Sequence, residues 1–416
     1  MTTASTTTVN GFVAPGFERV REAVEALATP WGRGGGGIAA YAGGELVVDL
    51  WGGDARPGQP WREDTLAPVA SVTKSWAGII VGRLVEQGIL DYQTTIATWW
   101  PEFAAHGKQG ITLHDLFMHS SGVLGFDGQV DFLDANDNAG WHDLDGIAAR
   151  LADAKPAWTP GTRNGYHAVS YGWLLNEVVR RTTGRTIGDL FHTDVAVPLG
   201  LDTHLGTSAE DFPRIAEVMV ADPTKGPWLM RKLLSSATKK GSDPATLFGQ
   251  ALLGNGRSTI LDRVEHYCAS PSWAAAEVPA SNGTTTPRSL ARLFAALAAG
   301  GTLDGVTILE PGTVALMRKI HNEIKDSVMT EPLPALLRGM IPKARTTYSL
   351  FPNPVLRGKL QAGPNPKAFV SAGFGGQLVM GDSDANIAFS STGTDFTPGR
   401  DAAIQGPALA ALYACL

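Results

Sequence analysis

The chain has 416 residues, of which 44% are hydrophobic and 18% are charged, and its formal net charge is −6. These proportions are typical of a globular enzyme and exclude disorder over most of the length. The negative charge and the lack of a basic run argue against a nucleic-acid partner, which would need a basic surface.

The first residues and the two cysteines indicate no special compartment. Residues 1–8 are polar and have neither the basic nor the apolar segment of a secretory signal. No later window is apolar for long enough to span a bilayer. Cys268 and Cys415 lie far apart and fit neither a metal site nor a disulfide framework. We therefore expect a cytoplasmic protein with no membrane segment, no metal and no cofactor.

A helix and a hairpin are predicted near the N-terminus. Residues 16–28 place apolar side chains at helical spacing. Residues 38–42 and 46–51 are strand-like, and the glycine pair between them is typical of a β-hairpin turn. A helix followed by a hairpin favours an antiparallel sheet with helices on its face.

The middle of the chain, residues 91–284, is predicted to be mainly helical. The strongest helix comes just before it, at residues 71–87, where apolar positions recur with helical periodicity. Shorter helices are expected within residues 111–119, with a threonine as N-cap, and at residues 169–183. Residues 222–258 instead mix Pro, Gly, Lys and Ser with apolar groups, which is typical of a lid or a pocket-forming insertion.

The C-terminal part of the chain combines helix and strand again. A helix is predicted at residues 287–299, with proline at its first position. Three strands and a final helix follow, at residues 368–371, 376–380, 385–390 and about 401–415. We therefore predict that residues 1–90 and 285–416 form one domain around a shared antiparallel sheet, with the helical domain 91–284 inserted between them.

Ser71 and Lys74 form a candidate nucleophile and base. They are three positions apart, so on a helix both side chains lie on one face. Serine needs a neighbouring base to attack a substrate. A lysine can be that base if burial lowers its pKa, and the apolar helix around Lys74 fits this requirement. Taken alone, the same residues also describe an N-cap serine followed by a solvated lysine.

Longer stretches around this pair carry a family resemblance. Ala70-Ser71-Val72-Thr73-Lys74, residues 88–91 and residues 111–123 resemble the class C β-lactamase family, and within it most of all the family VIII carboxylesterases. The resemblance implies a β-lactamase/transpeptidase-like fold of the α/β (α+β) class, with an antiparallel sheet flanked by helices plus a helical domain. It also implies a serine hydrolase that cleaves carboxylic esters, with short acyl chains, through a covalent acyl-enzyme on Ser71 and without a cofactor.

The second motif of this family is a tyrosine that follows a Pro-Gly turn. Tyr166 follows such a turn here, and by resemblance it is the second partner of Ser71 and Lys74, as a phenol or a phenolate. The class C lactamases have Asn two positions after this residue, where the present chain has Ala168. The missing amide favours an esterase over a lactamase.

The third motif is a glycine-rich strand, Ser371-Ala372-Gly373-Phe374-Gly375-Gly376-Gln377. By resemblance, the backbone N–H groups of Phe374 and Ser71 form an oxyanion hole, which would stabilise the tetrahedral intermediate. The residues predicted to bind substrate are Gly373, Gly375, Gly376 and His167. Small residues on this strand would let the substrate approach closely, although a tightly packed strand would need them too. Lactamases begin this motif with lysine, so a basic anchor for a substrate carboxylate is missing.

Other assignments of these residues remain open. The segment 168–172 resembles the nucleophile elbow of α/β-hydrolases, but no strand precedes it, and Ser170 is better placed at a helix start. His114 and His119 are five positions apart, which does not fit a zinc helix. An acyltransferase, an amide hydrolase, a weak β-lactamase or D,D-peptidase, and a non-catalytic binding protein are alternatives on the same scaffold. The expected partner is a small ester substrate, and a homo-oligomer is left open.

Overall fold

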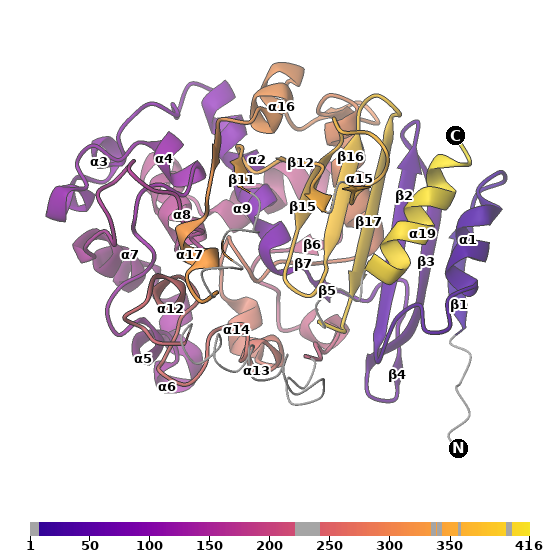
Figure 1. Ribbon diagram of the computed structural model, residues 1–416, viewed down its shortest axis with the longest axis horizontal. Helices are drawn as coiled ribbons and strands as arrows, with labels where there is room; N and C mark the ends of the chain where they lie inside the picture. The colour runs from indigo at the N-terminus through magenta and orange to yellow at the C-terminus, as the bar shows by residue number, and fades with distance from the viewer. Residues whose placement is uncertain (1–7, 221–241, 334–337, 339–342, 357–358, 397–401) are drawn as a thin grey trace.

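The computed structural model describes residues 8–220, 242–333, 338, 343–356, 359–396 and 402–416. Its centre is an antiparallel sheet of eight strands in the order β1-β3-β2-β17-β16-β15-β12, with β4 paired to β3 (Figure 1). The strands are β1 Val9–Val13, β2 Gly35–Ala42, β3 Glu45–Arg56, β4 Gln59–Pro60, β12 Phe351–Pro352, β15 Phe369–Ala372, β16 Leu378–Asp382 and β17 Ile387–Gly393. Because β2 pairs directly with β17, the prediction that both ends of the chain share one antiparallel sheet is confirmed.

Helices cover both faces of this sheet because side chains alternate along each strand. The covering helices are α1 Glu18–Glu25, α15 Pro287–Ala298 and α19 Ala402–Tyr413. In β2, Ile38 and Ala40 belong to the core under α1 and α19, which lie side by side in Figure 1. The intervening residues, Ala39 and Tyr41, belong to the opposite core under α15. The sheet is therefore the middle layer of three.

The chain between β5 (Ala67–Pro68) and α15 is mostly helical. Its helices are α2 Thr73–Glu86, α3 Ile96–Trp99, α4 Leu113–Phe117, α5 Gln129–Leu133, α6 Ala135–Asn138, α7 Leu144–Asp153, α8 Ser170–Thr183, α9 Ile187–Phe191, α10 Val197–Leu199, α12 Leu247–Ala251, α13 Val264–Cys268 and α14 Pro271–Ala275. One buried core extends from the sheet face under α15 through α2 into α8. Residues on both sides of the predicted domain boundaries, near residues 90 and 285, belong to this core. The boundaries remain a prediction.

Local signals placed several helix ends correctly. Thr112 is the N-cap of α4, and its hydroxyl oxygen accepts a hydrogen bond from the Asp115 N–H at 3.2 Å. The Asp115 carboxylate accepts the Thr112 N–H in return, which completes a capping box. Pro287 occupies the first turn of α15, as expected. The predicted helix 71–87 begins two residues later, because residues Ala70–Val72 form a 3₁₀ turn before α2.

Strand β1 was not predicted. Its sequence does not alternate between apolar and polar residues, because it lies at the edge of the sheet with its three central residues exposed. Gly11 has a φ of 108°, and a Cβ there would lie 2.0 Å from the Asp49 carbonyl oxygen of β3. Glycine at this position therefore allows the edge strand to approach its neighbour closely.

The predicted insertion 222–258 is only partly observed. Residues 221–241 lie outside the described residues, and residues 242–258 contain α12.

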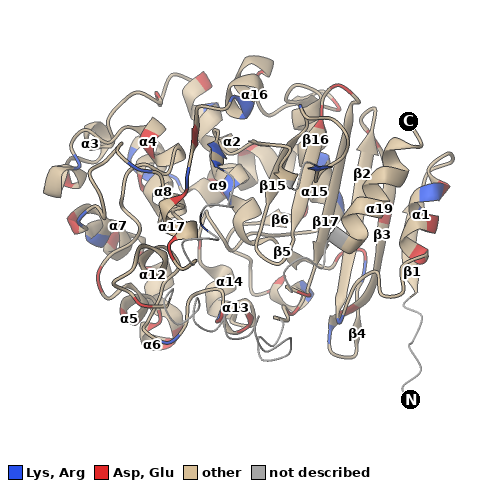
Figure 2. Cartoon of the chain, viewed as in Figure 1, with Lys and Arg blue, Asp and Glu red and all other residues tan. Residues whose placement is uncertain are grey.

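Blue and red segments are interspersed along the ribbon in Figure 2, so neither sign of charge gathers on one element in this view. Within the described ranges, none of the helices combines the length and the apolar character needed to cross a bilayer.

Candidate active site

Ser71 lies in a strained turn at the start of α2. Ala70, just before it, has a φ of 46°, which is a left-handed conformation that costs energy for a residue with a side chain. The Thr73 hydroxyl donates a hydrogen bond of 2.6 Å to the Ala70 carbonyl oxygen, and it accepts the Gly283 N–H at 3.0 Å. A small sheet of β5, β7 (Thr284–Thr285) and β6 (Thr203–His204) holds these two segments together. The turn is thus fixed from both sides.

Lys74 is buried, with 3% of its surface exposed, and lies beside the Ser71 hydroxyl. Its Nζ is 3.3 Å from Ser71 Oγ, 2.7 Å from the Ala168 carbonyl oxygen and 2.8 Å from the Ala280 carbonyl oxygen. Burial disfavours the ammonium and lowers the pKa of Lys74 to about 7. A neutral amine can donate its two hydrogens to the two carbonyls, and its lone pair then faces Ser71. This arrangement suits a base.

Tyr166 contacts the same hydroxyl from the other side. Its phenol donates a hydrogen bond of 2.7 Å to Ser71 Oγ. Burial is the main cause that raises the pKa of Tyr166 to about 12, so the side chain is a phenol at neutral pH. Of the two forms considered from the sequence, the geometry and the pKa favour the phenol. Ser71 Oγ is therefore held between an amine and a phenol.

The backbone around Tyr166 is anchored on two sides. On one side the Asn164 amide donates to the Met118 carbonyl oxygen at 2.6 Å, and the backbone of the next residue donates to the His119 carbonyl oxygen at 3.0 Å. On the other side the Tyr166 N–H is 3.1 Å from a carboxylate oxygen of Asp326. Asp326 is the N-cap of α17, Ser327–Thr330. Sequence reasoning missed Asp326. Its sequence shows only an aspartate before a short helical stretch, which is typical of an N-cap. Such a signal does not reveal the contact with Tyr166, 160 residues away.

The end of β15 approaches the Ser71 turn very closely. A Cβ on Gly373 would lie 2.3 Å from the Val69 carbonyl oxygen and 3.2 Å from the Ser71 nitrogen. The N–H groups of Ser71 and Phe374 make no hydrogen bond to any described residue. Both residues border the cavity, and the oxyanion hole assigned to these two donors stays a prediction.

Gly375 and Gly376 lie in the turn that follows and do not border the cavity. Their φ angles are 86° and 80°, and the Gly376 N–H donates to the Gly373 carbonyl oxygen at 3.2 Å. A Cβ on Gly375 would also lie 2.3 Å from the ring of Phe396. These glycines therefore serve the turn between β15 and β16, and their contact with substrate stays a prediction.

His167 points away from the cavity, contrary to the prediction that it contacts substrate. It is 1% exposed, and its ring nitrogens lie 2.7 Å from the Ser121 hydroxyl and 2.7 Å from the Gly165 carbonyl oxygen. Burial lowers the pKa of His167 to about 4, so the ring is neutral. His167 supports the loop behind Tyr166, with no polar atom left over for a ligand.

A cavity of about 380 Å³ opens at Ser71 and Tyr166. Ala168 presents its methyl group there, at the position where an asparagine amide was missing from the motif. Most of the remaining wall is apolar and includes Leu252, Ile260, Leu261, Val264, Trp273 and Phe396. Leu252 belongs to the predicted insertion, whereas the neighbouring wall residues follow it in the chain. Among the described wall residues, Asp326 is the one with a charged side chain.

The rival nucleophile Ser170 is not available for reaction. It begins α8, as expected, and is 1% exposed. Its hydroxyl donates a hydrogen bond of 2.8 Å to the Val123 carbonyl oxygen.

Over the described ranges, no three His, Cys, Asp or Glu side chains are grouped so as to hold a metal ion. Cys268 and Cys415 are free thiols, and Cys268 is buried in the cavity wall.

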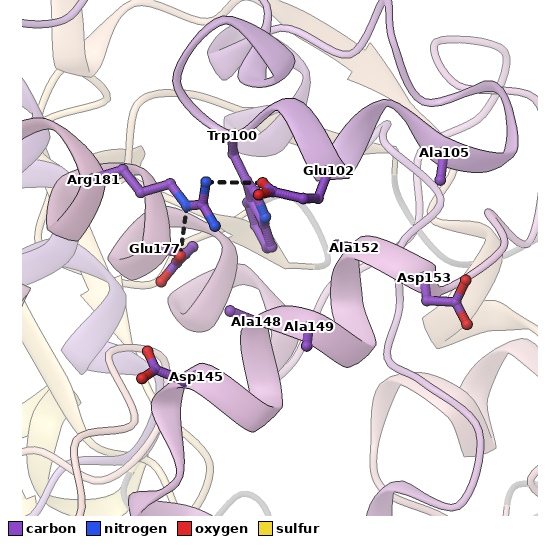
Figure 3. Close-up of a pocket in the computed structure, with 10 residues that line it drawn as sticks. All are labelled: Trp100, Glu102, Ala105, Asp145, Ala148, Ala149, Ala152, Asp153, Glu177 and Arg181. Atoms are coloured by element: carbon purple, nitrogen blue, oxygen red, sulfur yellow. Dashed lines mark hydrogen bonds and ion pairs between the residues drawn. The ribbon is translucent and has the colours of Figure 1, made fainter.

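A second hollow, of about 490 Å³, lies between α7, α8 and the 3₁₀ segment Pro101–Gly107 (Figure 3). Figure 3 shows Arg181 between two carboxylates, with its ion pairs to Glu177 at 2.7 Å and to Glu102 at 2.9 Å. The other two carboxylates of the hollow also have partners, because Asp145 pairs with Arg180 and Asp153 with His106. None of the residues predicted for catalysis lines the hollow. It offers no nucleophile comparable to Ser71.

Known proteins resemble this chain in sequence and in fold. A family model described as Beta-lactamase matches residues 20–414. The Esterase/beta-lactamase LipL of Mycobacterium tuberculosis is 33% identical over 312 residues, which cover 72% of this chain and 67% of LipL. Among solved structures, a family VIII carboxylesterase is similar with a TM-score of 0.77 at 31% identity, and the match covers 98% of this chain and 100% of the other. A penicillin-binding protein homologue from Caulobacter crescentus has a TM-score of 0.75 at 30% identity, with coverage of 98% and 100%.

Proposed function

The chain belongs to the beta-lactamase family, and on this premise we propose that it is a serine carboxylesterase that works through an acyl-enzyme on Ser71. The observation that carries this proposal is the position of Ser71 Oγ, 3.3 Å from Lys74 Nζ and 2.7 Å from the Tyr166 phenol. A serine hydroxyl with a neutral amine on one side has the base that it needs for attack. The similarity to LipL and to a family VIII carboxylesterase supports an ester as substrate.

In the proposed acylation step, Ser71 Oγ bonds to the carbonyl carbon of the ester while Lys74 takes the hydroxyl proton. The N–H groups of Ser71 and Phe374 bind the oxyanion that forms. One such donor typically stabilises the transition state by about 3 kcal/mol, and two donors together contribute several kcal/mol. The Tyr166 phenol then gives its proton to the departing alkoxide and recovers one from the Lys74 ammonium. The alcohol leaves and the acyl group stays on Ser71.

In the proposed deacylation step, the same groups act in the reverse direction. Water bonds to the acyl carbonyl carbon, and its proton passes through Tyr166 to Lys74. The bond to Ser71 Oγ breaks as that oxygen regains a proton from the lysine, and the carboxylic acid leaves. An alcohol in place of water would give acyl transfer, so the balance between hydrolysis and transfer depends on the acceptor that reaches the acyl-enzyme.

An ester is favoured over a β-lactam by two side chains. Ala168 borders the cavity with a methyl group and cannot bond a lactam amide. Ser371 stands in place of the lysine of the third lactamase motif, and its side chain is buried with 1% exposed. The described residues of the cavity wall therefore offer neither a side-chain amide nor a cation to a penicillin, and ester cleavage is the reaction that we propose.

Labelling with a fluorophosphonate serine probe tests this proposal. We expect one adduct by intact-mass measurement on the native chain and on Ser170→Ala, and none on Ser71→Ala. Tyr166→Phe should label and turn over at least about 100-fold more slowly, since a positioned proton donor contributes this much to rate. Its fold should persist, because the bond to Asp326 uses the Tyr166 backbone. An adduct that remains on Ser71→Ala, or wild-type turnover by Tyr166→Phe, would refute the assigned roles.

A further inference from the structure

Resting on the proposed esterase function, we propose that Asp326 selects the charge of the substrate. The cavity accepts esters whose acyl and alcohol groups are uncharged, and it discriminates against esters and lactams that carry a carboxylate. The observations behind this proposal are the place of Asp326 in the cavity wall, the bonds that hold its carboxylate, and the lack of a cation among the described wall residues.

Asp326 lies in the cavity wall, next to the backbone of Tyr166. It is half-buried and borders the same cavity as Ser71 and Tyr166. Its carboxylate oxygens are 3.1 and 3.2 Å from the Tyr166 backbone nitrogen, and the phenol of the same residue touches Ser71 Oγ at 2.7 Å. The carboxylate is therefore separated from the nucleophile by the length of one tyrosine side chain.

Burial raises the pKa of Asp326 above its usual range, and backbone N–H groups of Met329, Tyr166 and Val328 counteract part of that shift. Besides Tyr166, the N–H groups of Val328 and Met329 donate to it at 2.9 and 2.8 Å. Three N–H donors favour the charged form of a carboxyl group, because they bond an acceptor that carries negative charge. They also fix its position, so its field is part of the site whether or not substrate is bound.

No positive charge faces this anion from the described part of the wall. None of the described residues that border the cavity is Arg, Lys or His, and Lys74 lies behind Ser71 with its nitrogen bonded to two carbonyl oxygens. The charge of Asp326 acts on Tyr166. Burial is the largest cause that raises the pKa of this phenol, its hydrogen bond to Ser71 lowers the pKa, and the charge of Asp326 raises it further. A substrate carboxylate would meet the same repulsion.

Two esters of equal length test the proposal. The 4-nitrophenyl ester of pentanoic acid is neutral, and the mono-4-nitrophenyl ester of glutaric acid carries a carboxylate in place of the terminal methyl group. Each kcat/KM is divided by the rate of alkaline hydrolysis of that ester, which removes the difference in intrinsic reactivity. For the native chain we expect the corrected ratio of anionic to neutral ester to be about tenfold or more below one, the size of a like-charge contact across a partly buried site.

Removal of the charge should raise this ratio. Asp326→Asn and Asp326→Ser both keep an N-cap residue for α17 and lose the negative charge. We expect about a tenfold rise of the ratio in each, whatever happens to the absolute rate through Tyr166. Asp143→Asn is the matched control, since Asp143 caps α7 through a 2.8 Å bond to Gly146, is exposed and does not border the cavity. The ratio should not change in this control.

The outcomes separate this inference from the proposed function. Equal corrected rates of the two esters on the native chain, or a ratio that is unchanged in both Asp326 variants, would overturn it. Equal rates on the native chain overturn the proposal even if the variants do not fold. Fluorophosphonate labelling of Ser71 reports whether each variant is folded. If the native chain neither labels nor cleaves the neutral ester, the proposed esterase function fails instead. A native chain that prefers the anionic ester contradicts the charge selection and leaves the esterase proposal intact.

Discussion

Burial shifts the pKa values of Lys74 and Tyr166 in opposite directions, although the physical cause is the same. The interior disfavours charge, so it lowers the pKa of the lysine to about 7 and raises that of the tyrosine to about 12. Both side chains are therefore neutral near pH 8, one as an amine and the other as a phenol. Of the two, only the amine can accept the Ser71 proton, which assigns the base role to Lys74 and a relay role to Tyr166 in the proposed reaction.

This assignment predicts a pH profile. We expect kcat/KM for a neutral ester to rise with pH through a midpoint near 7, because Lys74 is an ammonium below that pH and a free amine above it. His167 should not contribute, since its pKa is lowered to about 4 by burial and its ring is neutral throughout this range. Loss of the Tyr166 proton would lower the rate only near pH 12. The profile can be measured by steady-state hydrolysis in buffers of constant ionic strength.

Lys108 supplies the control for this profile. Like Lys74 it is fully buried and donates to two carbonyl oxygens, those of Ala152 and Ala154, but it lies outside the cavity wall. Lys108→Met should leave the midpoint where it is, even if the variant is less stable. A native profile that stays flat across pH 7, or one that moves with Lys108→Met, would argue against Lys74 as the base.

Residues of the site could be predicted where the chemistry is local in sequence. Ser71 and Lys74 are one helical turn apart, and a motif of this kind can be recognised in the letters alone. Asp326 could not be found, because its contact with Tyr166 spans 160 residues. The prediction for His167 was wrong because adjacency to Tyr166 does not say on which side of the backbone a side chain points. The Tyr166 side chain contacts Ser71, whereas the His167 ring contacts Ser121.

At the scale of elements, the end of β15 packs against the strained turn before α2. We predict that Gly373→Ala lowers both the melting temperature and kcat/KM, because its Cβ would lie 2.3 Å from the Val69 carbonyl oxygen and would push the strand away from Ser71. Overpacking against backbone typically costs about 1–3 kcal/mol of stability. Thermal melting followed by circular dichroism, with ester hydrolysis on the same samples, measures both effects.

Gly312 is the matched control for this substitution. It lies in α16, Pro311–Arg318, and an added Cβ there meets nothing within 4 Å. Gly312→Ala should leave activity unchanged and raise the melting temperature slightly, because alanine favours a helix over glycine by about 1 kcal/mol. If Gly373→Ala matches this control in stability and activity, the close approach of β15 to the nucleophile is not required for function.

Elements with a strong pattern were predictable, and those that depend on a distant partner were not. The helical periodicity of residues 71–87 and the N-cap at Thr112 are local signals, and both led to real helices. Strand β1 exists because it pairs with β3, and its exposed centre leaves no alternation in the sequence to find. A large part of the apolar wall of the cavity comes from residues 252–273, and these could not be predicted because only the folded chain brings them to Ser71.

At the scale of the whole molecule, aromatic contacts cross the predicted domain boundaries. Trp76 stacks on Phe191 with ring centroids 5.1 Å apart, and Tyr92 stacks on Tyr348 at 3.8 Å. In each pair one ring belongs to the predicted helical domain and the other to the sheet domain. The boundaries at residues 90 and 285 were drawn from the order of the predicted helices and strands, which carries no information on packing across them. The continuous core indicates that the two parts depend on each other for stability.

We therefore predict that residues 91–284 do not fold when produced alone. The fragment would lose Trp76 from Phe191 and Tyr348 from Tyr92, and truncating one buried aromatic already costs about 3–5 kcal/mol, a large part of the stability of a typical domain. Circular dichroism should show no sigmoidal melt for the fragment, whereas the full chain should melt in one transition that coincides with the loss of fluorophosphonate labelling at Ser71. A cooperative melt of the fragment, or labelling of the full chain that disappears well before its helices unfold, would mean that the helical region is a separately stable domain and that the cavity forms when two independent units dock.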